Sequence, residues 1–504
     1  MRRRCYHPGL KARPSVLLKK SLIFVHRWLG VALCLLFLLW FASGIVMMYW
    51  DFPSVSDQDR LDHSPPLDPS KIKLSPSDAA RRAHLEHPAG TRIFMFDGKP
   101  IYQFESSNVS ADTGEEIGDL PPGVFERVAA EWTGLPWNAA KAELIKGVDQ
   151  WTVQGEFRDL RPLWKYSWPD GQQVYVSTVT GRVEQYTTSS SRFCAYLGAI
   201  PHWLYFTPLR KNGLAWSRFV TWSSAIATAS AILGITIGIW MYSPSKRYRY
   251  DGSPTSIPYR GQKRWHTILG LIVGIAAATW AFSGFLSMEP FPEKTTEPHI
   301  PPTLRGFELA GFASKTPAQA LAQLRNFKVK ELDLLSFEGE PAYLAKLDHG
   351  ATRIIPVNGE PMEQFPIDRL MSVIRKQAGD QLADLRVIND YDVYYLDRHH
   401  ERPLPVMYVR FNDAESTRYY IDPKTLRIVG GYSSSQWMTR WLYHGLHSFD
   451  FPWLYKYRPL WDIVVISFMT GGVALCVTSV ILAWRVLRRK LGGLVSGEDL
   501  AVET

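Results

Sequence analysis

The hydrophobic positions of this 504-residue chain are concentrated in four long runs rather than spread evenly. Each run approaches or exceeds the roughly 20 residues that a helix needs to cross about 30 Å of hydrocarbon. No run contains a charged side chain, so their length favours membrane spans over buried core helices. The four predicted spans are Trp28–Trp50, Phe219–Met241, Thr267–Met288 and Ile463–Trp484.

The basic residues that give the chain its net charge of +9 stand next to these runs. Cytoplasmic loops of membrane proteins carry an excess of Lys and Arg, so we expect both termini in the cytoplasm and residues 51–218 and 289–462 on the other side. This arrangement is not the footprint of a nucleic-acid-binding protein. The flanking basic residues are Arg2, Arg3, Arg4, Lys11, Arg13, Lys19 and Lys20, then Lys246, Arg247, Arg249, Arg260, Lys263 and Arg264, then Arg485, Arg488, Arg489 and Lys490.

The chain repeats itself with a period of about 240–245 residues. Repeats that each contain two spans keep the same orientation, so we expect two parallel repeats related by a pseudo-twofold axis along the membrane normal. This symmetry predicts which residues face each other. The aligned pairs include His26 with His266, Gly30 with Gly270, Trp40 with Trp280, Ser43-Gly44 with Ser283-Gly284, Arg161 with Arg402, Tyr175 with Tyr420, Arg182 with Arg427, His202 with His447, and Trp216 with Trp461.

Each long segment outside the spans begins with a helix signal and continues with strands. Ser75-Pro and Thr316-Pro are typical helix starts, and short alternating runs around Asp97-Gly and Glu338-Gly indicate hairpins. A second helix-and-strand part follows in each segment and ends in a strand pair beginning near Val174 or Arg418. The pattern predicts small α+β domains.

The helix followed by a "Tyr-x-hydrophobic…Thr-Gly-x-Val" hairpin, which begins at Tyr175, resembles the PepSY module. The second copy has Lys424-Thr425-Leu426 where the first has Thr-Gly. PepSY units flanked by membrane helices, from about His26 to Trp484, resemble the PepSY-associated transmembrane proteins, which include iron-regulated inner-membrane proteins similar to periplasmic ferric-siderophore reductases. The resemblance implies an α+β membrane protein with a four-helix transmembrane bundle from two parallel repeats and periplasmic PepSY-like domains.

These inferences divide the chain into nine segments. In order they are a basic cytoplasmic tail (1–21), a first span (22–50), a PepSY-like domain of two units (51–190), an interfacial helix with the second span (191–241), a cytoplasmic loop (242–265), a third span (266–288), a second PepSY-like domain of two units (289–435), an interfacial helix with the fourth span (436–485), and a cytoplasmic tail (486–504).

Two pairs of histidines occupy matched positions at the ends of the predicted spans. His26 and His266 stand at the cytoplasmic mouths, and Gly30 and Gly270 follow them at i+4 on the same helix face. The glycines leave a bare patch on which a flat macrocycle can lie. Since the pseudo-twofold relates the spans, we expect the two imidazoles to face each other.

His202 and His447 form the second pair, in aromatic segments about 16 residues before the second and fourth spans. His444 has Ala199 opposite it in the first copy, so symmetry does not select it, and it remains a reserve ligand. Ser43-Gly44 and Ser283-Gly284 are interpreted as places of close helix packing.

Two imidazoles facing each other in a helix bundle make the axial ligand set of a six-coordinate b-type haem. We therefore expect two such haems, bound through the iron by His26 with His266 and by His202 with His447. The siderophore reductases that the chain resembles use membrane-embedded histidines in this way. Arg27, Lys263 and Arg264 are candidates for pairing with propionates. The competing interpretations are a polar histidine tip at the membrane interface and a zinc or copper site, which normally needs more ligands.

The paired histidines predict electron transfer across the membrane, and the resemblance implies an oxidoreductase of the bacterial inner membrane that reduces a ferric siderophore or another ferric chelate in the periplasm. Its expected partners are the lipid bilayer, that chelate and a cytoplasmic or quinol electron donor, because no nucleotide-binding motif is present. The absence of Cys-x-x-Cys argues against c-type haem. The alternatives are a non-enzymatic PepSY protein that binds or regulates periplasmic peptides or proteases, and a transporter, which the lack of acidic residues in the spans disfavours.

Overall fold

A computed structural model describes residues 14–85, 88, 90–104, 107–118, 120–291 and 299–496. The basic residues Arg2 to Arg13 lie outside them. The chain forms two compact units, each described here by itself. The first unit comprises the described residues of Met1–Phe52, Phe193–Pro292 and Met438–Thr504, and the second those of Pro53–Arg192 and Glu293–Trp437.

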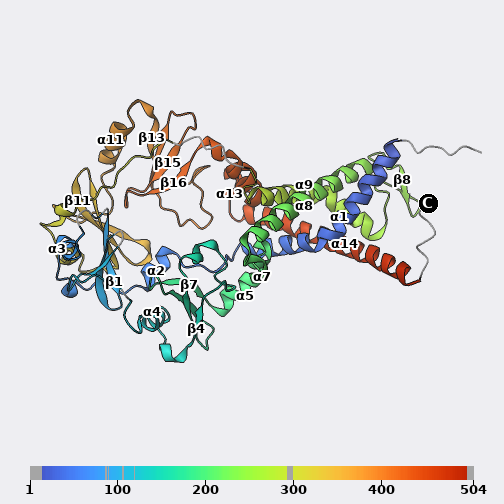
Figure 1. Cartoon of the computed structure of the whole chain (residues 1–504). Coiled ribbons are helices and arrows are strands. Elements are labelled where there is room, and N and C mark those ends of the chain that lie inside the picture. Colours follow the sequence, from blue (N-terminus) through green and yellow to red (C-terminus); the bar gives the residue numbers. More distant parts are fainter. Residues whose placement is uncertain are drawn as a thin grey trace, which may run out of the picture. The chain divides into compact units, whose positions relative to one another are not determined.

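Four long helices make up most of the first unit (Figure 1). Among the described residues they are the helices long and apolar enough to cross a membrane, which confirms the prediction of four apolar spans. Three of them begin well before the predicted spans, and His26 therefore lies well inside its helix. The helices are α1 (Pro14–Met47), α8 (Gly213–Met241), α9 (Gly261–Leu286) and α14 (Leu460–Ser496).

The four helices pack in a ring, so that α1 and α9 each contact α8 and α14. This order puts α1 and α9 on a diagonal, where the ring centres of Phe41 and Trp280 approach to 5.6 Å. Large apolar side chains on the outer faces are exposed, such as Leu35 at 67 % and Ile275 at 68 %. Such surfaces are stable against lipid rather than water, so the unit fits a bilayer.

Short elements complete the first unit. A hairpin joins α8 to α9, and short helical turns precede α8 and α14. They are β8 (Tyr248–Tyr250) and β9 (Ser253–Thr255), α5 (Ser189–Leu197, which begins in the second unit), α6 (Ala199–Trp203) and α7 (Thr207–Arg210), and the π-helix η8 (Met438–Gly445), α12 (Leu446–Ser448) and α13 (Pro452–Tyr455).

A six-stranded antiparallel sheet is the centre of the second unit, in the order β12-β11-β10-β1-β2-β3. The pairing of β1 with β10 joins strands from the two segments that the sequence analysis treats as separate domains. In this pairing Arg92 lies opposite Asp333 and Ile93 opposite Leu332. The strands are β1 (Thr91–Phe96), β2 (Lys99–Phe104), β3 (Asn108–Ser110), β10 (Glu331–Phe337), β11 (Glu340–Lys346) and β12 (Thr352–Pro356).

Alternate residues of these strands enter two apolar clusters, one that includes α3 (Pro76–Arg82) and α10 (Pro317–Gln323) and one that includes α11 (Ile367–Ala378). Ile93, Tyr102 and Tyr343 are fully buried in the first cluster. Helices α3 and α10 contribute apolar side chains to the same cluster. The Ser75 and Thr316 side chains cap these helices by accepting from the amides of Asp78 and Gln319, so both predicted helix starts are confirmed.

Two four-stranded antiparallel sheets, each with a helix, complete the second unit. The helices are tied to the central sheet in the same way, since Arg127 of α4 binds Asp97 and Arg369 of α11 binds Glu338, each in the turn after a central strand. The first group is α4 (Val124–Thr133), β4 (Lys141–Ile145), β5 (Leu163–Ser167), β6 (Gln173–Ser177) and β7 (Val183–Thr187), and the second is α11 (Ile367–Ala378), β13 (Leu382–Ile388), β14 (Val406–Phe411), β15 (Arg418–Ile421) and β16 (Ile428–Tyr432).

One further α-helix and seven 3-10 turns connect these elements in the described residues. They are α2 (Asp57–His63), η1 (Pro69–Lys71), η2 (Trp137–Ala139), η3 (Gly155–Arg158), η4 (Leu309–Phe312), η5 (Asp348–Gly350), η6 (Gly379–Gln381) and η7 (Ser434–Gln436). The protein is thus a mixed α+β structure with several small antiparallel sheets and four apolar helices.

The pairing of β1 with β10 makes a testable prediction. Ile93→Ala removes a fully buried side chain at this junction, so we expect it to lower the free energy of unfolding by about 2–5 kcal/mol. Ile428→Ala is the matched control, because Ile428 is 41 % exposed on β16 and its loss should cost less than about 1 kcal/mol. The unfolding midpoint of the purified protein, followed by tryptophan fluorescence, measures both, and equal losses would contradict the fold.

Candidate functional site

His26 on α1 and His266 on α9 lie close together on diagonal helices of the bundle. Their ring centres are 6.2 Å apart and the ring planes are inclined by 36°. Three polar groups on the two intervening helices hold the rings. The His26 Nδ1–H donates to the carbonyl oxygen of Ser230 over 3.0 Å, and His266 Nδ1 lies 3.2 Å from the Thr478 hydroxyl and 3.3 Å from that of Ser479.

The glycines near this inner pair have two different roles. On α8, a Cβ added to Gly234 would lie 2.7 Å from His26 Cε1, so a larger residue there would collide with the ring. At Gly30 no atom lies within 4 Å of an added Cβ, and at Gly270 the first contact is Leu475 at 4.0 Å. The space beside Gly30 and Gly270 is therefore open and has room for a group larger than the glycine hydrogen.

His202 on α6 and His447 on α12 form a second close pair. Their ring centres are 6.0 Å apart, with the planes inclined by 70°. His202 Nδ1 lies 3.2 Å from both the Trp40 carbonyl and the Ser43 hydroxyl of α1, and His447 Nδ1 lies 2.9 Å from the Ser283 hydroxyl of α9. The serines occupy matched positions in the two halves of the chain.

The hydrogen bonds indicate which ring nitrogen carries the proton. The Ser43 hydroxyl donates to the Leu39 carbonyl and the Ser283 hydroxyl to the Trp280 carbonyl, so each serine oxygen is left to accept from a histidine. The Thr478 hydroxyl likewise donates to a carbonyl, and a carbonyl accepts from His26. All four neutral imidazoles then carry the proton on Nδ1 and the lone pair on Nε2, which is the form that binds metals.

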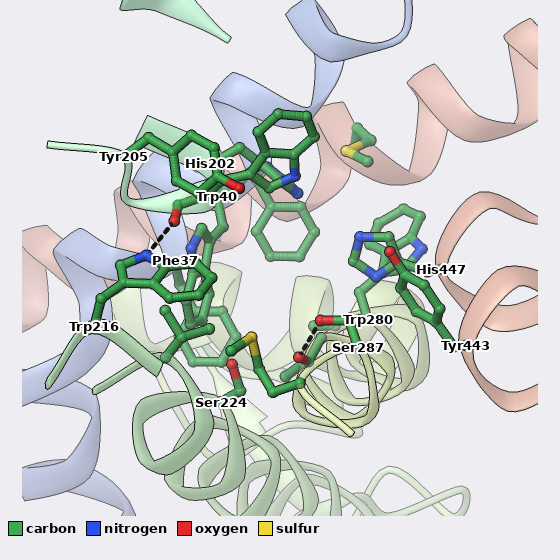
Figure 2. A pocket seen from close by; sticks show the side chains of 18 residues that line it. Phe37, Trp40, His202, Tyr205, Trp216, Ser224, Trp280, Ser287, Tyr443 and His447 are labelled. Carbon is green, nitrogen blue, oxygen red and sulfur yellow. Dashed lines mark hydrogen bonds between the residues drawn. The ribbon is translucent and has the colours of Figure 1, made fainter. Parts of the chain in front are cut away.

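A cavity of about 290 Å³ surrounds the outer pair, His202 and His447 (Figure 2). Its walls are mostly aromatic and apolar, which suits a flat, largely apolar ligand. The Trp280 indole N–H is buried and has no hydrogen-bond partner among the described residues. The other lining residues are Phe37, Trp40, Phe41, Trp203, Tyr205, Trp216, Val220, Ser224, Ala277, Ala281, Gly284, Ser287, Met288, Tyr443 and Met469.

The two histidine pairs fit the axial ligand set of a haem. Two imidazoles that bind one metal through Nε2 at about 2.0 Å have ring centres about 6.3 Å apart. The observed separations of 6.2 Å and 6.0 Å are close to that value. Within the described chain no three His, Cys, Asp or Glu side chains gather as a metal site, whereas an axial pair needs only two ligands. The donor set and the tautomers fit the group at both pairs, and the open space beside Gly30 and Gly270 fits it at the inner pair.

Other predicted site residues lie apart from the rings of the four histidines. Arg27 is exposed and stacks on Phe24 and Trp28 of its own helix. Arg264 donates to the Thr255 hydroxyl of the hairpin. His444 is exposed, does not line the outer cavity, and contacts Tyr443 with ring centres 4.6 Å apart.

The sequence analysis missed the residues that orient the imidazoles. Ser43 and Ser283 are interpreted there as packing residues, yet their hydroxyls bond the histidines of the outer pair. The neighbouring Gly44 does pack closely, since an added Cβ would lie 3.0 Å from Met469 Cε. The recurrence of Ser-Gly in both halves was the available signal, but only the folded chain shows which ring each serine meets.

A scan of protein-family models and a search of curated proteins both found nothing that matches this chain. The candidate site therefore stands on its own geometry. That geometry brings two pairs of imidazoles together in one helix bundle.

The contact of Gly234 with His26 can be tested directly. Gly234→Ala places a methyl group against the ring, so we expect it to displace His26 and to lower the stability of the protein by about 1–3 kcal/mol. Gly270→Ala is the control, because its methyl meets only Leu475 at 4.0 Å. Thermal unfolding of the two variants measures the difference, and an equal loss in both would show that Gly234 has no special role.

Proposed function

We propose that this protein is a haem-containing electron-transfer protein of the bacterial inner membrane, and that it reduces a ferric siderophore or another ferric chelate in the periplasm. The observation that carries the proposal is the pair of imidazole couples, 6.2 Å and 6.0 Å between ring centres, with Nδ1 hydrogen-bonded in all four rings. The substrate comes from the resemblance to PepSY-associated transmembrane proteins.

The proposal includes a duplicated chain of two parallel repeats with PepSY-like domains. Contacts that recur about 245 residues apart support it. The Trp216 indole donates to the Trp203 carbonyl and the Trp461 indole to the Ser448 carbonyl, both over 2.9 Å. In the second unit the aligned strands β1 and β10 pair with each other in an antiparallel register, as strands related by a twofold axis do.

The proposed orientation has both termini in the cytoplasm and the second unit in the periplasm. Its support is the charge at one end of the bundle, where the start of α1, the α8–α9 hairpin and the end of α14 carry Lys and Arg. The inner histidine pair lies toward this end. The outer pair lies toward the end from which the chain continues into the second unit.

Haem held by two axial histidines supplies one-electron transfer and has no open iron position for O₂. Two pairs of histidines in this chain are the proposed places at which such a group binds. Hydrogen bonds at Nδ1 fix the rings, and aromatic side chains line the outer cavity. His26 and Ser43 are separated by about 25 Å along α1, and Phe41 and Trp280 belong to the apolar core of the bundle beside the outer pair.

The overall reaction transfers one electron from a quinol, flavoprotein or soluble reductant to Fe(III) in the chelate. Fe(II) is held less tightly by hard oxygen ligands, so its formation releases iron for uptake. The competing proposal, a PepSY protein that binds periplasmic peptides or proteases without redox chemistry, requires no cofactor in the bundle.

The first test is the absorption spectrum of the detergent-purified full chain, recorded oxidised and after dithionite reduction, with haem quantified per chain. We expect the spectrum of six-coordinate b-type haem and two haems per chain. A colourless protein from iron-replete, haem-competent cells contradicts the proposal and favours the peptide-binding alternative.

Single histidine variants test the pairing. We expect His26→Ala and His266→Ala each to remove one haem, and His202→Ala and His447→Ala each to remove the other, so that His26→Ala/His447→Ala removes both. His400→Ala in the exposed loop of the second unit is the control and should retain both haems. If His26→Ala and His447→Ala remove the same single haem, the two-site pairing is wrong.

Gly30→Leu tests whether the open space beside His26 holds a macrocycle. No described atom lies within 4 Å of an added Cβ, and leucine favours a helix more than glycine does, so we expect the unfolding temperature of haem-free protein not to fall. In haem-containing protein the leucine occupies the space that the macrocycle needs, and we expect the inner haem to be lost. Full haem retention would place the macrocycle elsewhere.

A further inference from the structure

The face of the six-stranded sheet opposite α3 and α10 carries charged side chains at its centre. Asp333 and Glu331 on β10 are 5 % and 9 % exposed, and Arg92 lies opposite Asp333 on β1. Charged groups are expensive to bury unless they meet opposite charges. The ion pairs that these side chains make therefore show whether positive and negative charges are present in equal number.

A cavity of about 430 Å³ opens onto this charged centre, and all of its walls belong to the second unit. The volume lies within the range of about 300–1,000 Å³ that is usual for small-molecule sites. Basic side chains outnumber acidic ones in the walls. The basic residues are Arg60, Arg92, Arg182, Lys330, Lys346 and Arg427, and the acidic residues are Asp57, Asp97, Glu131 and Glu331.

The acidic groups at the centre are already shared among several cations. Lys346 lies 2.5 Å from Glu331 and 3.3 Å from Asp333. Arg427 lies 3.2 Å from Asp333, and Arg92 lies 3.6 Å from Glu331. Two carboxylates thus serve at least three cations, and the centre has a surplus of positive charge.

Among the described residues Arg182 has no carboxylate within ion-pair distance, and Glu331 and Glu184 act on it only from farther away. Its Nη2–H donates to Gln103 Oε1 over 3.1 Å, and the Arg92 Nε–H donates to the same oxygen over 2.6 Å. Both guanidinium groups also lie over the ring of Phe94, at 5.0 Å and 5.5 Å from its centre. Burial lowers the pKa of Arg182, and the neighbouring Arg92 lowers it further.

We propose that this cavity binds a small organic acid with two or three carboxylates, held by Arg182 and Arg427. Guanidinium groups bind planar carboxylates through two parallel hydrogen bonds. The two arginines are aligned in the repeat and enter the cavity from corresponding turns, between β6 and β7 and between β15 and β16. A ligand with several carboxylates can reach both.

Features of the cavity walls favour a carboxylate over a phosphate. Phe94 and Trp132 provide apolar wall for the carbon skeleton of an organic acid. The Thr352 hydroxyl lines the cavity and is buried without a hydrogen-bond partner among the described residues, so it is available to the ligand.

This inference goes beyond the proposed electron transfer and does not depend on it. Every residue of the cavity lies in the second unit, whereas both histidine pairs lie in the first. The anion site can therefore be tested on haem-free and haem-containing protein alike, and failure of one proposal leaves the other standing.

The test is binding of citrate to the purified full chain, measured by calorimetry at constant ionic strength, with acetate and pyrophosphate as comparison ligands. We expect citrate to bind with a sub-millimolar dissociation constant and acetate to bind far more weakly. Arg182→Gln and Arg427→Gln should each weaken citrate binding by about tenfold or more, because each removes a charged hydrogen-bond donor. Tighter binding of pyrophosphate than of citrate would overturn the carboxylate assignment.

Arg386→Gln is the matched control, because it removes one positive charge from an arginine that is 59 % exposed in its side chain and does not line the cavity. Its citrate affinity should stay within about twofold of the parent. Thermal unfolding without ligand separates binding from a structural role, since a variant that loses citrate affinity at an unchanged midpoint has lost a binding residue. Unchanged citrate affinity in both cavity variants, or no citrate binding by the parent protein, overturns the proposal.

Discussion

An imidazole inside an apolar helix bundle must satisfy its N–H group within the protein, because lipid offers no acceptor. In this chain the requirement is met at Nδ1 by a backbone carbonyl at His26 and by hydroxyls at His266 and His447, with both kinds of acceptor at His202. The same bonds set the tautomer and the direction of each ring. The helices must also bring the two rings of each pair within about 6 Å of each other.

Close approach of the helices is what makes those separations reachable. A Cβ at Gly472 of α14 would lie 2.3 Å from the ring of Phe41, and one at Gly471 would lie 2.7 Å from Val273. Small residues at such contacts let membrane helices pack without a hydrophobic driving force between them. Gly234 has the corresponding role beside His26, so glycines both permit the bundle and shape the space around the rings.

In the second unit, buried charged groups are stabilised by ion pairs with one another. One face of its central sheet is apolar and packs with α3 and α10. The other face gathers charges at the junction of β1 and β10, where Glu331 and Asp333 are shared among Arg92, Lys346 and Arg427. Positive side chains outnumber negative ones in the walls of the cavity at this centre, which is the physical reason for the anion site proposed there.

Periodicity and composition by themselves determined the four apolar spans, the starts of the short helices at Ser75 and Thr316, and the hairpins around Asp97 and Glu338. These features are local, since they depend on runs of apolar residues, capping side chains and turn residues close in the chain. The internal alignment also selected His26, His266, His202 and His447, and their close approach in two pairs was expected from symmetry alone.

Only the tertiary structure decided how distant parts meet. The pairing of β1 with β10 joins strands that are about 240 residues apart, and nothing in either strand alone specifies that partner. The bonds from Ser43 and Ser283 to the outer histidines, and the placement of Arg182 beside Arg92, likewise depend on side chains that meet across the fold. A sequence shows which residues can accept, donate or carry charge, whereas packing decides which of those capacities are satisfied and which remain for a ligand.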